Sequence, residues 1–162
     1  MAATAGRGGE IKIELPTTDL GNPTTVGNVA TLNTAVGTSL LGSLRGWSLE
    51  ETVDTLDTTV MDNTASGFIF RDVIPSFKSW TASADFIYDP ADTDVAFDAQ
   101  FVAGNTVNIA IFPEGDDGAS SQLYGGKAMI TSISRSATFD GLIECSATFN
   151  GRDDLISGQT AS

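Results

Sequence analysis

Acidic side chains are the first candidates for chemistry in this sequence, because it carries 21 Asp and Glu residues and no histidine. Asp89, Asp92 and Asp94 cluster in DPADTD. A calcium loop needs D-x-D-x-D-G spacing with a later glutamate, and neither that spacing nor the glycine is present. A strand end followed by a helix cap accounts for all three acids. The acids of PEGDDG, at 114–117, are typical of a solvated turn, so neither cluster predicts a metal site.

Nucleophilic and phosphate-binding chemistry also lack a specific pattern. Cys145 is the single cysteine, and no histidine is available to activate it, so we expect a buried small hydrophobic side chain. The glycines of GRGGE, at 6–10, lack the G-x-x-x-x-G-K-[ST] frame of a phosphate-binding loop. Trp47 and Trp80 each lie on the apolar side of an alternating segment, which favours core packing over a binding platform. We therefore predict no enzyme, no metal and no cofactor, and a binding or structural protein remains.

Composition narrows the class further. The 162 residues fit one domain, and the 41% hydrophobic fraction is enough to build its core. Eight Lys and Arg residues leave a net charge of −13, which argues against wrapping nucleic acid and against an anionic membrane surface. No apolar run reaches the roughly 18–20 residues of a membrane-spanning helix. The start, MAATAGRGGE, lacks the basic and apolar regions of a secretory signal, so we expect no signal peptide.

The elements that position these side chains are predicted to be strands. Alternation of apolar and polar residues indicates a short strand at 11–15 and a long one that begins near Leu44. The long strand changes face near Asp54-Thr55, where we expect a β-bulge. Further strands are predicted at 80–88, 107–111, 124–137 and 142–150.

A turn, a hairpin and one helix complete the predicted fold. Residues 74–76 (IPS) are interpreted as a turn, and Asp140-Gly141 as the loop of a hairpin. A helix is predicted at 92–103, with an apolar stripe of Val95, Ala99 and Val102. The sum is a mainly β fold with two packed antiparallel sheets, a β-sandwich or partly open barrel, and one flanking α-helix.

The chain is predicted to have an arm, one domain and a tail. The Gly- and Ala-rich residues 1–10 are expected to form a flexible N-terminal arm. A single β domain follows at 11–156, and the polar residues 157–162 form a C-terminal tail. Two long loops are expected within the domain, at 17–43 and 61–73, and loops of such length are usually functional.

Several stretches in a fixed order carry a resemblance to a known family. They are GWSLE at 46–50, EETVDTLDTTV, RDVIPSFKSW ending at Trp80, YDP, VNIAIFPEG and GGKAMITSISRSATFDGLIECSATFNG. Their order and spacing over residues 44–151 resemble the major tail tube proteins of long-tailed double-stranded DNA bacteriophages.

The resemblance implies a fold and an assembly. In that family two packed β-sheets with a flanking helix form the subunit, and subunits form hexameric rings. One sheet of each subunit joins its neighbours in a β-barrel around a channel, and stacked rings form the tube through which DNA passes. The implied location is the virion tail, after synthesis in the host cytoplasm. The implied partners are other copies of the chain and the tail terminator, tape measure and baseplate or tail tip proteins.

A channel for DNA should repel the polyanion mildly, so the polar strand faces are its candidate lining. These faces comprise Ser48, Glu50, Thr52, Asp54, Thr81, Ser83, Asp85, Glu144, Ser146 and Thr148. Contacts between subunits or rings are expected from the loop 61–73. They are also expected from two cations, which we place on one face of a strand and expect to pair with acids. These contact residues are Met61, Phe68, Ile69, Phe70, Arg71, Lys127 and Arg135.

Two other classes stay open at this point. A virion decoration or adhesin-type β-sandwich would bind a glycan or receptor as an isolated monomer. An enzyme with a carboxylate pair would lose turnover when one such pair is changed. An acidic surface is compatible with all three classes.

Overall fold

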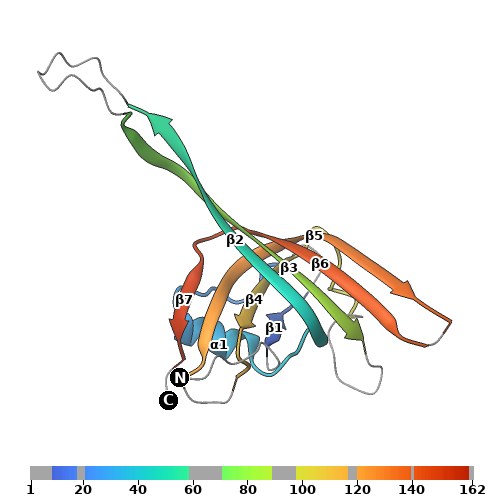
Figure 1. Ribbon diagram of the computed structural model, residues 1–162. Coiled ribbons are helices and arrows are strands. Elements are labelled where there is room, and N and C mark those ends of the chain that lie inside the picture. Colours follow the sequence, from blue (N-terminus) through green and yellow to red (C-terminus); the bar gives the residue numbers. More distant parts are fainter. Residues whose placement is uncertain are drawn as a thin grey trace, which may run out of the picture.

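Seven antiparallel strands form one sheet in the residues that the structure, a computed structural model, describes: 9–17, 21–58, 71–88, 98–116, 120–139 and 141–160. The strands are β1 (Glu10–Glu14), β2 (Ser43–Asp57), β3 (Val73–Tyr88), β4 (Thr106–Phe112), β5 (Gln122–Ala137), β6 (Ile143–Gly151) and β7 (Ile156–Gln159). Helix α1 (Val29–Val36) lies between β1 and β2 in the chain. The strand order is β1-β4-β5-β6-β3-β2, and β7 pairs with the start of β5 (Figure 1).

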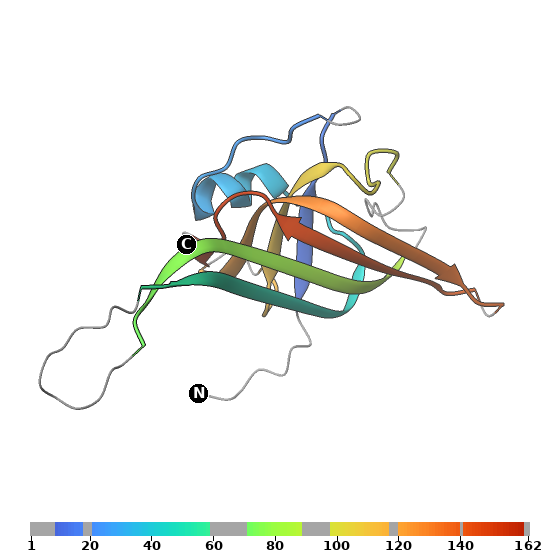
Figure 2. The same cartoon turned by 90° about the horizontal axis from the view of Figure 1, so that it is seen from above.

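Strand β5 belongs to two halves of this sheet, which enclose the main core between them (Figure 2). Ile13 and Ile109, from the β1-β4 half, lie in the same buried cluster as Phe86 and Phe149, from the β6-β3 half. The chain before β2 approaches β1, where the Leu41 N–H donates to the carbonyl of Ile11 at 2.9 Å, but the sheet does not close. The prediction of a mainly β fold is therefore confirmed, and of the two predicted forms the structure has the partly open barrel. Its two packed layers are the two halves of one sheet.

Helix α1 covers the outer face of the β4-β5 half. Leu32 and Val36 are buried against Ala110, Phe112 and Leu123 in a second, smaller core cluster. This helix lies inside 17–43, where a loop was predicted. The predicted helix at 92–103 is wrong in its described part, because residues 98–104 form turns and Val102 is exposed. Residues 89–97 lie outside the described residues.

Strands β2 and β3 form a hairpin that extends well beyond the rest of the sheet. The pairing shifts between Val53 and Thr55, which confirms a bulge at the predicted place, although the extra residue belongs to β3, between Pro75 and Lys78. The turn predicted at 74–76 is wrong, because these residues belong to β3 and Pro75 pairs with Thr55. Strand β6 pairs with β3 only from Thr81 onward, so no third strand requires an N–H from Pro75.

Two features of the last third of the chain were not predicted. The pairing of β5 with β6 shifts between Ile130 and Ser132, and this bulge reverses the alternation along β5. The prediction that Lys127 and Arg135 share a face is therefore wrong. Lys127 pairs with Asn108, and Arg135 pairs with the buried Cys145. Strand β7, at Ile156–Gln159, occupies part of the region interpreted as a polar tail.

Candidate functional site

A polar face runs across β2, β3, β6 and the second half of β5, and we use the name polar face for it below. Directly paired residues of antiparallel strands project to the same side of a sheet, so the pairing shows which side chains share this face. One row across the four strands consists of hydroxyl side chains only: Ser48, Ser83, Thr148 and Ser132. The Ser48 and Ser83 hydroxyls lie 2.5 Å apart, and those of Thr52 and Ser79 lie 2.9 Å apart.

The opposite side of the same strands is core. Ala82, Ala84 and Phe86 of β3 are all buried, and the residues between them, Ser83 and Asp85, belong to the polar face. This strict alternation was readable in the sequence, because a strand buried on one side shows a period of two. The polar face is thus the accessible side of a sheet whose other side is fixed by packing.

Nine of the ten side chains predicted for the channel lie together on this face. They come from β2, β3 and β6, and all nine are exposed or half-buried. Asp54 is the exception, because it lies where the pairing of β2 with β3 shifts and has no directly paired residue on β3.

The sequence missed the contribution of β5. Ser132, Ser134 and Ser136 pair with Thr148, Ser146 and Glu144 and complete the polar face. The available signal was the alternation of these serines with Ile133 and Arg135. This alternation could not be assigned to a face of the sheet without the bulge at Thr131, because the bulge changes which residues of β5 point outward.

The polar face carries acids and one paired cation. Arg45 Nη1 donates to Glu144 Oε1 at 2.5 Å, across an irregularity of β2 between Leu44 and Gly46 that was not predicted. No ion pair of Glu50 or Asp85 occurs among the described residues. The face is therefore polar with a net negative charge.

Two edges of this four-stranded half have no partner strand within the described chain. β2 pairs with β3 alone, and residues 132–137 of β5 pair with β6 alone. An unpaired edge presents backbone N–H and C=O groups that can pair with another chain. The two edges lie on opposite sides of the polar face.

The residues predicted for contacts between subunits are distributed differently. Met61, Phe68, Ile69 and Phe70 lie outside the described residues. Arg71 Nε lies 3.0 Å from Asp57 Oδ2 within the β2–β3 hairpin. Arg135 Nη2 donates to the carbonyl of Phe101 at 3.1 Å and its guanidinium lies 5.9 Å from the ring centroid. Neither Lys127 nor Arg135 is on the polar face.

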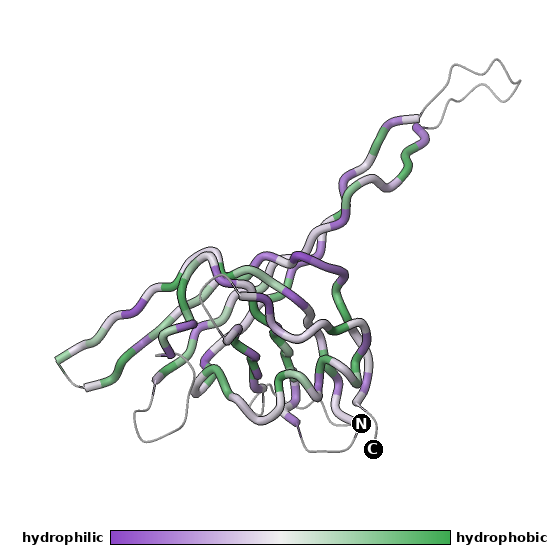
Figure 3. The backbone as a smooth tube through the Cα atoms, turned by 180° about the vertical axis from the view of Figure 1, so that it is seen from behind, coloured by the Kyte–Doolittle hydropathy of each residue, from purple (hydrophilic) through white to green (hydrophobic). Residues whose placement is uncertain are grey.

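The hairpin of β2 and β3 is two-stranded beyond β6, and we call residues 51–57 and 73–80 the distal hairpin. Hydrophobic and hydrophilic residues alternate along it (Figure 3). Large apolar side chains are nevertheless exposed here: Val53, Leu56, Val73, Ile74 and Phe77.

The two tryptophans differ in their surroundings. Trp80 is buried as predicted, and its indole Nε1 donates to the carbonyl of Asp153 at 2.7 Å. Trp47 is 38% exposed on the edge strand β2, so its predicted place in the core is wrong. Cys145 is buried as expected, and desolvation raises the pKa of its thiol while Arg135 lowers it to a smaller extent.

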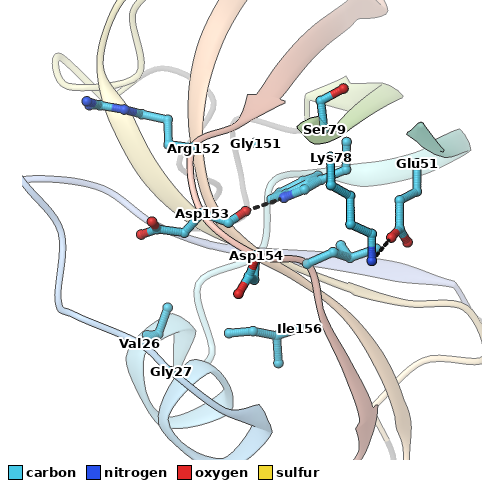
Figure 4. A pocket seen from close by; sticks show the side chains of 12 residues that line it. Val26, Gly27, Glu51, Lys78, Ser79, Gly151, Arg152, Asp153, Asp154 and Ile156 are labelled. Carbon is cyan, nitrogen blue, oxygen red and sulfur yellow. Dashed lines mark hydrogen bonds and ion pairs between the residues drawn. The ribbon is translucent and has the colours of Figure 1, made fainter. Parts of the chain in front are cut away.

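A pocket lies at the base of the distal hairpin, next to Trp80 (Figure 4). Lys78 and Glu51 form an ion pair at its rim, and the hydrogen bond that Lys78 donates to the Glu51 carboxylate raises the pKa of Lys78. Among the described residues, no three His, Cys, Asp or Glu side chains gather to hold a metal ion. No described helix is long and apolar enough to cross a membrane.

Comparisons with known proteins agree with this geometry. The model of the phage tail tube protein family matches residues 28–155 of the chain. A comparison with curated protein sequences gives no significant match.

Solved structures of similar fold come from phage tails and related particles. A chain in the virion of a native gene transfer agent particle is 20% identical, with a TM-score of 0.52 over 76% of this chain and 88% of that chain. A chain in the tail of the empty gene transfer agent particle, refined with C6 symmetry, is 19% identical, with a TM-score of 0.51 over 76% of this chain and 86% of that chain. The SPP1 tail tube protein is 12% identical, with a TM-score of 0.51 over 94% of this chain and 78% of that chain.

Proposed function

Because the chain belongs to the phage tail tube protein family, we propose that its copies form hexameric rings that stack into the tail tube of a virion. The polar face lines the central channel, and genomic DNA passes along it into the host. The protein is made in the host cytoplasm and acts in the assembled tail.

The observation that carries this proposal is the combination of the polar face with its two unpaired edges. β2 and β5 run in opposite directions at the two sides of the four-stranded half. Edge β2 of one copy can therefore pair with residues 132–137 of the next copy and continue the antiparallel alternation without interruption. Such a head-to-tail contact uses two different surfaces, and it closes into a ring when the rotation between copies closes.

Six copies are supported by the C6 symmetry of the related gene transfer agent tail. Four strands from each copy would give a barrel of 24 strands. Barrels of about 16–18 strands already enclose a water-filled channel, so a larger strand number leaves room for a wide polar lumen.

The side chains of the polar face suit the passage of a polyanion. Lys and Arg hold DNA through phosphate contacts, and here the single cation, Arg45, is paired with Glu144. Glu50 and Asp85 repel phosphate over a short distance, since charges in about 0.15 M salt are screened within roughly 8 Å. The surrounding hydroxyls are neutral and bind water. DNA would then move through bound water without a specific site.

Other contacts complete the proposed tail. The loop 61–73 and the adjoining hairpin, with Arg71, are assigned to contacts between subunits or between rings. Lys127 and Arg135 are assigned to subunit contacts. The terminator, tape measure and tail tip or baseplate proteins are the expected partners at the ends and inside of the tube.

The experiment that tests this function is negative-stain electron microscopy of the purified chain over a concentration series, with sedimentation velocity on the same samples. We expect rings of six copies and, at higher concentration, tubes with a stain-filled channel. A single species of monomer mass at every concentration, with no ring or tube on the grids, would contradict the proposal.

A further inference from the structure

Exposed apolar side chains gather at two places in the described residues. Of nine exposed large hydrophobic side chains, five lie on the distal hairpin. Two more, Phe139 and Leu142, lie in the turn between β5 and β6, which we call the β5–β6 tip, and Phe139 is fully exposed. Scattered apolar side chains on a surface are normal, but clusters of large ones mark contact surfaces. We therefore interpret both clusters as contact surfaces.

The two clusters lie at opposite ends of the same four strands. Tyr88 pairs with Ile143 at the end next to the β5–β6 tip, and Thr81 pairs with Asn150 at the end next to the distal hairpin. Figures 1 and 2 show the two hairpins leaving the body in opposite directions. The two apolar clusters therefore cannot meet within one copy, but they can meet when copies repeat along the strand direction.

We propose that the β5–β6 tip of one copy packs Phe139 and Leu142 against the distal hairpin of a second copy in the neighbouring ring. This inference rests on the proposed tube and names the surfaces that hold successive rings together. Leu56 and Ile74 are directly paired, so they share one side of the hairpin and offer a single apolar patch. Phe77, at 78% exposure, is the largest side chain available beside them.

The reach of the two hairpins fits this contact. Eight residues of β3 precede the first residue that pairs with β6, and a strand rises about 3.3 Å per residue, so the distal hairpin extends by roughly 26 Å. The β5–β6 tip extends a few residues past the opposite end of the same strands. A copy stacked along the strand direction thus brings its tip alongside the hairpin of the copy below.

The charges of the distal hairpin also favour a second copy as its partner. Arg71, just before β3, pairs with Asp57 of the hairpin, and Lys78 pairs with Glu51 within it. These internal pairs neutralise the cations and two of the acids before any contact forms. When this hairpin packs against another strongly acidic copy, fewer unpaired charges are therefore buried in the contact.

Cysteine cross-linking tests the contact directly in assembled protein. In a Cys145→Ala background, copies carrying Phe77→Cys are mixed with copies carrying Phe139→Cys, assembled and oxidised. We expect a disulfide-linked dimer from the mixture and not from either variant alone. The matched control replaces Phe139→Cys by Val102→Cys, an exposed apolar position beside the middle of β5, and should give no dimer.

Loss of the apolar tip separates ring stacking from ring formation. The double variant Phe139→Ser, Leu142→Ser should still form rings, while tube formation should need at least about tenfold more protein, because aromatic anchors dominate such contacts. Val102→Ser should assemble like the wild type. Tube formation by the double variant at the wild-type protein concentration, or no cross-link between the two cysteine variants in assembled tubes, would overturn this inference and leave the proposed function intact. Absence of rings from the wild type would overturn the proposed function itself.

Discussion

At the scale of single residues, Trp80 links the distal hairpin to the end of the barrel. Its indole is buried at the base of the hairpin and bonded to the Asp153 carbonyl, and Gly151 lies directly against the ring. A Cβ atom at Gly151 would lie 2.2 Å from two indole atoms, a distance at which one of the groups must move. The absence of a side chain at this glycine is therefore a packing requirement.

We expect Gly151→Ala to destabilise the fold by about 1–3 kcal/mol, the usual cost of overpacking a well-packed core. Chemical denaturation followed by tryptophan fluorescence measures this change. Gly46→Ala is the matched control, because nothing lies within 4 Å of a Cβ at that position in β2. Equal stabilities for the two variants would show that Trp80 moves aside without cost.

Side chains of the polar face could largely be predicted from the sequence, because alternation in β2, β3 and β6 is regular there. The pairing of Arg45 with Glu144 could not be predicted, since it depends on the irregularity between Leu44 and Gly46. The exposure of Trp47 was missed for a related reason. Its face points inward, but β2 is an edge strand and covers only part of the indole.

At the scale of elements, α1 is held by its caps and by tertiary packing more than by its composition. Its sequence, VATLNTAV, contains four β-branched residues, which are weak helix formers. Asn28 and Thr31 form a capping box, in which the Asn28 side chain accepts from the Thr31 N–H at 2.9 Å. Leu32 and Val36 then anchor the helix on the sheet.

We expect Asn28→Ala to lower the free energy of unfolding by about 1 kcal/mol, since it removes the N-cap acceptor. Asn33→Ala, inside the same helix, is the matched control and should not destabilise, because alanine is the better helix former. Urea denaturation of both variants measures the difference. A loss of stability in Asn33→Ala that equals the loss in Asn28→Ala would refute the role of the cap.

The helix and the β5 bulge show which elements the sequence could not predict. Weak intrinsic propensity left 29–36 as a loop, although Asn28 and Gly37 mark its two ends. The bulge at Thr131 depends on pairing with β6, a contact between strands that periodicity along β5 alone does not show. Strands β1, β4 and β6 were predictable, because each is buried on at least one side over most of its length, whereas β7 was not predicted.

At the scale of the whole molecule, the proposed channel depends on the sign of the charge repeated around the ring. Asp85 is exposed on the polar face with no ion pair among the described residues, and each ring would carry six of them. Reversing this charge in every copy would place phosphate contacts inside the tube.

We expect tubes of Asp85→Lys to hold short duplex DNA at about 50 mM salt and to release it at several hundred millimolar, following counterion release. Co-sedimentation with labelled DNA, followed by nuclease treatment, measures this retention and its location. Glu114→Lys, an exposed position after β4, is the control for DNA bound elsewhere. Protection from nuclease should occur with Asp85→Lys alone, and equal protection in both variants would contradict the assignment of the polar face.

Strand β5 has a mechanical consequence, because it is hydrogen-bonded to β4 and β7 in one half and to β6 in the other. A pull along the strands of the inner wall, such as drag from a moving filament, loads these ladders in shear. Many hydrogen bonds then resist at once, whereas a pull across the strands would break them one after another. The outer half of each copy, with α1 packed on it, would thus share the load of the inner wall.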